Sequence, residues 1–158
     1  MFILLLPGQL KASDANNDIY CMAQNIYFES GNQPLAGKVA VGHVVLNRLK
    51  HMNYPGSVCG VVYQAKLKQN WKGNMVPILH QCQFSWYCDG NSDEVRNLKS
   101  FDKSQKIANL AMLQYSKLKS EGLDYTEGAR YYHTYEISPR WSRTFPKVGR
   151  IGDHIFYR

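Results

Sequence analysis

The stretch DIYCMAQNIYFESGNQPLAGKVAVGHVVLNRLK, residues 18–50, decides the fold. In its first part, apolar side chains recur three and four positions apart, which is the pattern of one helix face; they are Ile19, Met22, Ala23, Ile26 and Tyr27. Asn17 or Asp18 can cap the start of this helix, and Gly31 can end it. Pro34 suits the first turn of a second helix. The pattern therefore predicts two helices joined by a tight turn through residues 29–33.

The second predicted helix, residues 34–50, is apolar around most of its circumference. A helix without a polar face is buried among other elements, so we expect this helix to lie at the centre of the domain. Gly37 and Gly42 each lower its intrinsic stability by roughly 1 kcal/mol. We interpret them as positions where another backbone comes close.

Outside this stretch the patterns are shorter. Residues 54–56 predict a turn, Ser57 caps a short helix that reaches Tyr63, and residues 66–73 predict a basic loop. Residues 100–121 predict a long helix closed by Gly122; its inward side chains would be Ile107, Leu110, Ala111, Leu113 and Leu118. Residues 129–135 and 151–157 are aromatic and predict a small antiparallel ribbon. The expected fold class is α+β, a mainly helical single domain with this ribbon in its C-terminal third.

Composition limits the class of protein. The 158 residues are 44% hydrophobic and 20% charged, which excludes a disordered or fibrous chain. The net charge of +7 favours a polyanionic partner: nucleic acid, an anionic membrane or an acidic wall polymer. Aromatic residues, at 13%, suit stacking on sugars or bases. No stretch approaches the ~20 apolar residues of a transmembrane helix, so we expect no membrane insertion.

The cysteines and histidines do not indicate a metal. Cys21, Cys59, Cys82 and Cys88 allow up to two disulfides, and the short spacing of the last two allows a bridge that involves one of them. There is no C-x-x-C pair, and the five histidines share no ligand-like spacing, so we expect no metal and no cofactor. The apolar run 2–6 is shorter than a secretory core, which favours a segment packed on the domain over a cleavable signal.

Glu29 is the first candidate for chemistry. It lies beside the apolar stripe in the last turn of the first predicted helix, where the helix dipole is negative. Partial burial and the dipole both raise the pKa of a carboxyl group. A carboxylic acid that keeps its proton near neutral pH can protonate the leaving oxygen of a glycosidic bond. The alternative interpretation is an exposed glutamate with no chemical role.

Several blocks of the chain occur in the order of a known family. They are IYFES (26–30) with QP (33–34), Gly37, VAV (39–41), Val44 and NR (47–48); YP (54–55) with VCGVVYQ (58–64); QFSW (83–86) with DG (89–90); GARYYH (128–133); PRW (139–141); and IGDHIFY (151–157). Together they resemble the SleB/CwlJ-type cell-wall hydrolases of spore-cortex-lytic enzymes and phage lysins. The resemblance implies a lysozyme-like catalytic domain over residues 18–158, after an N-terminal segment 1–17.

The resemblance also implies an activity and a partner. Such a domain cleaves the glycan strand of peptidoglycan between N-acetylmuramic acid and N-acetylglucosamine, with no nucleic acid involved. We expect a monomer that acts on the bacterial cell wall after secretion, in the periplasm or after release by a phage. A non-catalytic wall-binding protein with the same fold is the alternative, and a nucleic-acid-binding domain has only the charge and the tyrosines in its favour.

The family's catalytic acid is the glutamate of a tyrosine-x-glutamate motif, here Glu29 after Tyr27. One glutamate suffices for lytic transglycosylation, which we favour, because it protonates the glycosidic oxygen and then takes a proton from the muramic 6-hydroxyl. A hydrolase would use a second carboxylate. The candidates, none with a spacing that decides the matter, are Asp89, Asp93, Asp124 and Glu127.

The expected substrate-binding residues come from three segments. An amide and a hydroxyl flank an aromatic ring in residues 83–85, so this segment could bind N-acetyl sugars or could be a turn that packs Phe84 and Trp86 into the core. In the ribbon, alternation sends one of Tyr132 and His133 inward and the other outward. The full expected set is Tyr27, Gln83, Phe84, Ser85, Thr126, Tyr132 and His133. We expect core positions at Trp141, His154, Phe156 and Tyr157.

The chain departs from the family pattern in three places. Gly31 and Asn32 replace a common arginine-glycine pair, and DYTEGA (124–129) replaces DPTGGA, so that Glu127 could narrow the cleft or add a charge to it. Residues 66–81 form a stretch longer than in compact members. These departures bear on substrate preference more than on the identity of the acid.

Overall fold

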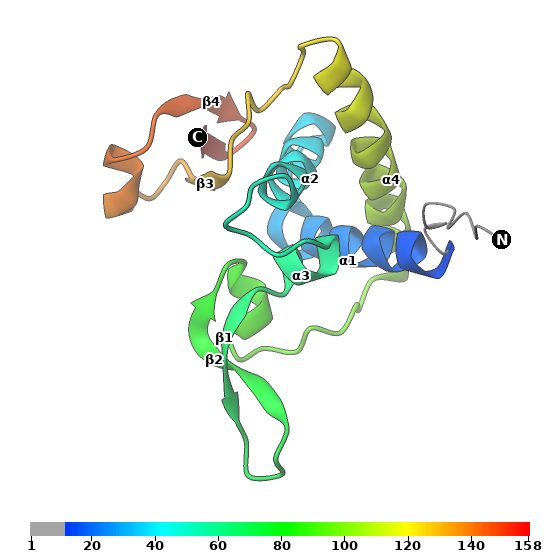
Figure 1. The fold of residues 1–158 in the computed structure, drawn as a ribbon, viewed down its shortest axis with the longest axis vertical. Coiled ribbons are helices and arrows are strands. Elements are labelled where there is room, and N and C mark those ends of the chain that lie inside the picture. Colours follow the sequence, from blue (N-terminus) through cyan, green and yellow to red (C-terminus); the bar gives the residue numbers. More distant parts are fainter. Residues whose placement is uncertain (1–11) are drawn as a thin grey trace, which may run out of the picture.

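The computed structural model describes the backbone of residues 12–158 and the side chains of residues 15–158, so the apolar run 2–6 lies outside the described residues. Figure 1 shows a helical body with a projecting β-hairpin and a separate small sheet. The elements are α1 (Ala12–Ser30), α2 (Leu35–Leu49), α3 (Val58–Val62), β1 (Ala65–Gln69), β2 (Met75–Cys82), the 3-10 helix η1 (Ser85–Cys88), α4 (Leu98–Ser120), β3 (Tyr131–Thr134), the 3-10 helix η2 (Arg140–Arg143), β4 (Lys147–Ile151) and β5 (His154–Tyr157). The α+β, mainly helical class is confirmed.

The first two helices form as predicted, but their starts differ. Helix α1 begins at Ala12, so Asn17 and Asp18 lie inside it, and the prediction that one of them caps it was wrong. Asn17 is exposed, so its side chain reaches solvent and does not compete with the hydrogen bonds of the helix. Pro34 is the N-cap of α2 rather than a residue of its first turn.

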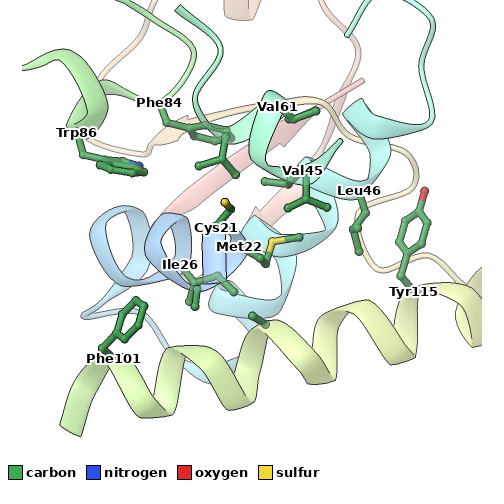
Figure 2. Close-up of a cluster of buried hydrophobic side chains, with 14 residues drawn as sticks. Cys21, Met22, Ile26, Val45, Leu46, Val61, Phe84, Trp86, Phe101 and Tyr115 are labelled. Carbon is green, nitrogen blue, oxygen red and sulfur yellow. The ribbon is translucent and has the colours of Figure 1, made fainter. Parts of the chain in front are cut away.

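Helix α2 is the buried central helix. Its side chains from Val39 to Arg48 are all buried, because α1, α3 and α4 pack around it. A Cβ at Gly42 would lie 3.1 Å from the Cβ of Ala111 in α4, so the predicted close approach occurs here, against a side chain rather than a backbone. Figure 2 shows the main apolar cluster, with side chains of α1 and α2 gathered over α4.

Helix α4 packs inward partly as predicted: Ala111 is fully buried and Ile107 packs against the core. Its buried residues are Phe101, Ser104, Ala108, Ala111 and Tyr115. Leu113, predicted to point inward, is 67% exposed. It lies two positions from both Ala111 and Tyr115, and at about 100° per residue this spacing places it on the opposite side of the helix. The helix ends as predicted before Gly122, which has a φ of 69°.

Residues 66–73, predicted as a basic loop, instead form strand β1 and the turn of a hairpin. Leu67 faces Pro77, Lys68 faces Val76 and Gln69 faces Met75 across the two strands. The side chain of Asn70 accepts from the backbone N–H groups of Lys72 and Asn74, which closes the turn. This strand was missed because an exposed hairpin does not need a buried apolar face. Its lysines therefore replace the apolar residues that would have indicated a strand. The Cys82–Cys88 disulfide joins the base of this hairpin to η1.

The C-terminal ribbon is confirmed and gains a third strand. Strand β5 lies between β3 and β4, with antiparallel pairing on both sides. The second disulfide, Cys21–Cys59, joins α1 to α3, so all four cysteines are paired. In the part of the chain that the structure describes, no helix combines the length and the apolar character that crossing a membrane requires.

Candidate active site

Glu29 occupies the last turn of α1, where the chain turns sharply into α2. A side chain at Gly31 would bring a Cβ within 2.8 Å of the carbonyl oxygen of Tyr27, so glycine is the residue that fits this turn. The N–H of Gln33 donates to the carbonyl of Ser30 at 2.9 Å, and the Ser30 hydroxyl donates to the carbonyl of Ile26 at 2.8 Å. These contacts fix the backbone that carries the carboxyl group.

Among the described residues, one group donates a hydrogen bond directly to the Glu29 carboxyl and one positive charge lies near it. The hydroxyl of Tyr132 in β3 donates to Glu29 Oε2 at 2.8 Å. Arg48 of α2 supplies the positive charge. Arg48 is itself held in place, because its Nε donates to the carbonyl of Arg130 at 2.8 Å and its guanidinium lies 4.8 Å from the ring centre of Phe84.

Burial raises the pKa of Glu29 above its ordinary value, and this effect exceeds the lowering by the Tyr132 hydrogen bond and the Arg48 charge. Burial, together with the neighbouring Glu29, also raises the pKa of Tyr132, which therefore stays a neutral donor. The site thus holds a carboxylic acid that keeps its proton to higher pH. It also holds two groups that favour the carboxylate once the proton has left.

The side chain of Glu29 lines a cleft of about 510 Å³. The end of α1, the helix η1, strand β3 and the segment that leads into η2 form its walls. The lining residues are Phe28, Glu29, Ser85, Trp86, Asp89, Tyr132, His133, Thr134, Ile137, Pro139, Trp141 and His154. Aromatic rings interleaved with hydroxyl and imidazole groups are the surface that sugar rings bind by stacking and hydrogen bonding.

Three of the predicted substrate-binding residues, Ser85, Tyr132 and His133, line this cleft with Glu29. Tyr132 turns toward the helical core and Glu29, whereas His133 packs on Tyr157 and Trp141. The two side chains lie on opposite faces of β3, as alternation requires, but His133 is buried rather than turned outward, and both side chains reach the cleft. The Nε2 of His133 lies 2.9 Å from the Tyr157 hydroxyl, which fixes the imidazole ring.

The other four predicted residues lie elsewhere. Gln83 lines a separate hollow at the base of the hairpin, and Tyr27 lines another on the far side of α1, next to α4. Phe84 is buried, as the alternative interpretation of this segment expected. Thr126 is fully buried; its hydroxyl donates to Asp124 and accepts from Asn47. These hydrogen bonds give Thr126 a structural role, so its expected contact with substrate has no support in the geometry.

Of the four candidate second carboxylates, only Asp89 lines the cleft. A backbone hydrogen bond from Asn91 lowers the pKa of Asp89, so this group is ionised at neutral pH. Asp124 accepts from the N–H groups of Thr126 and Gly128 and so organises its own loop. Glu127 is exposed and outside the cleft lining, so the expectation that it narrows the cleft was wrong. Its φ of 47° is a backbone conformation that suits glycine.

Sequence reasoning missed part of the cleft. Trp141 and His154, assigned to the core, both line it, although His154 is also buried. Thr134 ends β3, and Ile137 and Pro139 lie in the irregular segment that follows it. Pro139 belongs to the PRW block, but no local pattern indicated that any of the three residues faces the cleft. Burial lowers the pKa of His154, which keeps this imidazole neutral beside Tyr132. Among the described residues, no group of three or more histidine, cysteine or acidic side chains is arranged to hold a metal ion.

Comparisons with known proteins match this architecture. A sequence model of the cell wall hydrolase family matches residues 32–157. The spore cortex-lytic enzyme of Halalkalibacterium halodurans is 32% identical over 148 residues, which cover 92% of this chain and 36% of that protein. The Bacillus subtilis enzyme of the same name is 30% identical over 90% of this chain and 38% of its own length. The chain thus spans less than two fifths of these relatives.

The solved catalytic domain of the Bacillus cereus SleB protein superposes with a TM-score of 0.65 at 27% identity, over 97% of this chain and all of that one. The catalytic domain of the germination-specific lytic transglycosylase SleB from Bacillus anthracis gives a TM-score of 0.64 at 27% identity, with the same coverage. The fold is therefore the lysozyme-like α+β fold of these domains. The chain belongs to the cell wall hydrolase family. Glu29 lies three residues before the range that the family model matches.

Proposed function

We propose that this chain cleaves the glycan strand of peptidoglycan between N-acetylmuramic acid and N-acetylglucosamine, with Glu29 as general acid and base. One observation carries the proposal: a partly buried carboxyl with a raised pKa opens into an aromatic cleft and accepts a 2.8 Å hydrogen bond from Tyr132. The names of the relatives agree with a wall polymer as substrate. The reaction needs no cofactor, and we propose a monomer that acts on the bacterial cell wall without nucleic acid.

The surroundings of Glu29 suit both halves of a lytic transglycosylation. The protonated carboxyl first gives its proton to the glycosidic oxygen as the bond from this oxygen to the anomeric carbon breaks. The carboxylate then takes the proton of the muramic 6-hydroxyl, whose oxygen bonds to the same carbon and closes a 1,6-anhydro ring. Burial keeps the acid protonated beforehand, while Tyr132 and Arg48 stabilise the carboxylate that forms in between. No water is consumed, and Glu29 recovers its proton.

Hydrolysis is the second candidate, because Asp89 lines the same cleft as an ionised carboxylate. It could stabilise positive charge at the anomeric carbon or activate a water molecule. We favour transglycosylation because the SleB domain of similar fold carries that name and because Glu29 alone can complete the reaction. Mass spectrometry of the soluble products distinguishes the two, since an anhydro product is lighter by one water than its hydrolytic counterpart.

The decisive test compares Glu29→Gln with wild type on purified peptidoglycan sacculi. We expect the variant to fold and to lose at least about 100-fold in release of soluble fragments, the usual contribution of a general acid. Glu94→Gln is the matched control, because Glu94 is exposed and outside the cleft lining. Near-full activity of Glu29→Gln would contradict the proposal. Binding of wild type to sacculi without release of fragments would instead indicate a non-catalytic wall-binding protein.

A further inference from the structure

The β1–β2 hairpin, residues 65–82, projects from the body of the domain (Figure 1). Its main packing partner is η1 at its base, so its tip and much of both strands face solvent. The cleft and the chemistry proposed above make no use of the projecting part. The projecting part of the hairpin is therefore a surface whose role the cleft does not explain.

Large apolar side chains are exposed along this hairpin. Trp71, in the turn, is 89% exposed, Met75 is 60% exposed and Leu79 is 57% exposed. Leu67, at 48% exposed, faces Pro77 across the strands, and both lie on the same side of the hairpin as Met75. Exposed apolar groups gathered on one projecting element indicate a surface that is covered by a partner.

The charged side chains of the hairpin are all positive. Lys66, Lys68 and Lys72 carry positive charge, and residues 65–82 contain no aspartate or glutamate. The ammonium group of Lys72 lies 4.8 Å from the ring centre of Trp71, so a cation and the most exposed aromatic ring of the hairpin share its tip. A partner that covers the tip must therefore accept apolar side chains and positive charges together.

We propose that this hairpin docks on the surface of a bilayer that contains anionic phospholipids. Tryptophan prefers the boundary between headgroups and acyl chains, and the aliphatic side chains gain free energy by entering the same layer. Lys72, beside Trp71, can keep its ammonium group at the anionic headgroups while its stem lies along the ring. Lys68, on the side of the strand opposite Leu67, adds attraction to the anionic surface over a longer distance. Leucine and methionine offer no hydrogen bonds to a polyhydroxylated glycan, which is why these observations favour a lipid surface. Such docking is peripheral and needs no spanning helix.

The base of the hairpin would give this docking a consequence for the cleft. The Cys82–Cys88 disulfide ties the end of β2 to η1, and the hydrogen bond from the N–H of Gln83 to the carbonyl of Gln64, 2.9 Å long, closes the base of the hairpin beside it. Ser85 of η1 and Asp89 directly after it line the cleft. A docked hairpin therefore sets the orientation of the cleft relative to the membrane. The inference stands apart from the proposed function, because it concerns a different surface and a different partner.

The test measures co-sedimentation of the full chain with vesicles of equimolar phosphatidylglycerol and phosphatidylcholine, and with vesicles of phosphatidylcholine alone. We expect binding to the anionic vesicles that weakens with salt, and much weaker binding to the neutral ones. Combined Lys66→Gln, Lys68→Gln and Lys72→Gln should weaken it about 100-fold, at about fivefold per lysine. Combined Leu67→Ser and Trp71→Ser should weaken it about 10-fold or more.

Matched controls come from α4, whose exposed residues have the same chemistry. Lys99→Gln, Lys103→Gln and Lys117→Gln together, and Leu98→Ser with Leu113→Ser, should leave vesicle binding within about twofold of wild type, because these side chains lie on another exposed surface. All variants should cleave soluble glycan fragments like wild type, which separates this inference from the proposed function. Absence of binding by wild type, or equal loss in the α4 variants, would overturn it. Hairpin-dependent binding to sacculi but not to vesicles would overturn it in favour of a glycan partner.

Discussion

Tyr132→Phe is the most informative single change in the cleft. It removes the hydroxyl that donates to Glu29 Oε2 at 2.8 Å and keeps the ring that packs on Phe156 and His154. This hydrogen bond stabilises the ionised carboxylate and lowers the pKa of Glu29, whereas burial raises it. Loss of the hydroxyl therefore raises the pKa further. A hydrogen bond to a charged group contributes about 1.5–3 kcal/mol, which corresponds to roughly one to two pH units.

The expected readout is the dependence of kcat/KM on pH. The active form has a protonated Glu29, so activity is lost as pH rises through the pKa of that group in the free enzyme. In Tyr132→Phe this alkaline limb should move to higher pH by about one unit or more. The plateau rate should also fall, because the carboxylate that forms after the first proton transfer loses a donor.

Tyr125→Phe is the matched control, because Tyr125 is 65% exposed and lies outside the lining of both hollows that contain Glu29. Its alkaline limb should coincide with that of wild type. An alkaline limb that stays in place in Tyr132→Phe, or moves to lower pH, would refute the reasoning, since the hydroxyl would then not govern the ionisation of Glu29.

Three further changes test the energetics. In urea unfolding, Glu29→Gln should be more stable than wild type at about pH 8 and equally stable at about pH 4. The pKa of Glu29 is raised in the folded state, so wild type loses stability as pH rises from the pKa of the unfolded chain through that of the folded one. Equal stability of the two proteins at both pH values would contradict the burial argument. Gln33→Ala removes hydrogen bonds of 3.1 and 2.9 Å to Asp153, which join the turn after Glu29 to the hairpin of β4 and β5. The free energy of unfolding should fall by about 1–3 kcal/mol, and glycan cleavage should slow. An unchanged urea midpoint and an unchanged cleavage rate would show that these hydrogen bonds do not hold the turn. Replacing Cys21 and Cys59 by alanine should lower the free energy of unfolding by about 4 kcal/mol, and replacing Cys82 and Cys88 by about 2 kcal/mol. The first disulfide closes a loop of 38 residues and the second a loop of only 6. The reverse order in urea unfolding would contradict the explanation from loop entropy.

Predictions from the sequence succeeded where the signal was local. The first two helices, the short helix capped by Ser57 and the glycine that closes α4 all follow from residues a few positions apart. The errors arose where local signals compete. The lysines of β1 hid a strand that is fixed by pairing with β2, and Leu113 is exposed because the positions of α1 and α2 decide which apolar residues of α4 are covered.

The sequence by itself determined the turn that carries Glu29. The apolar periodicity of residues 18–50 predicts the two helices, and Gly31 predicts the end of the first one. Only the tertiary structure decided what surrounds that carboxyl. Tyr132 lies 103 positions from Glu29 along the chain, yet its hydroxyl donates to the carboxyl. Thr126, a few residues before Tyr132, is buried against Asn47 and does not reach the cleft. Short-range patterns set backbone conformation, but the pKa and partners of a buried group depend on packing between segments whose separation no spacing rule specifies.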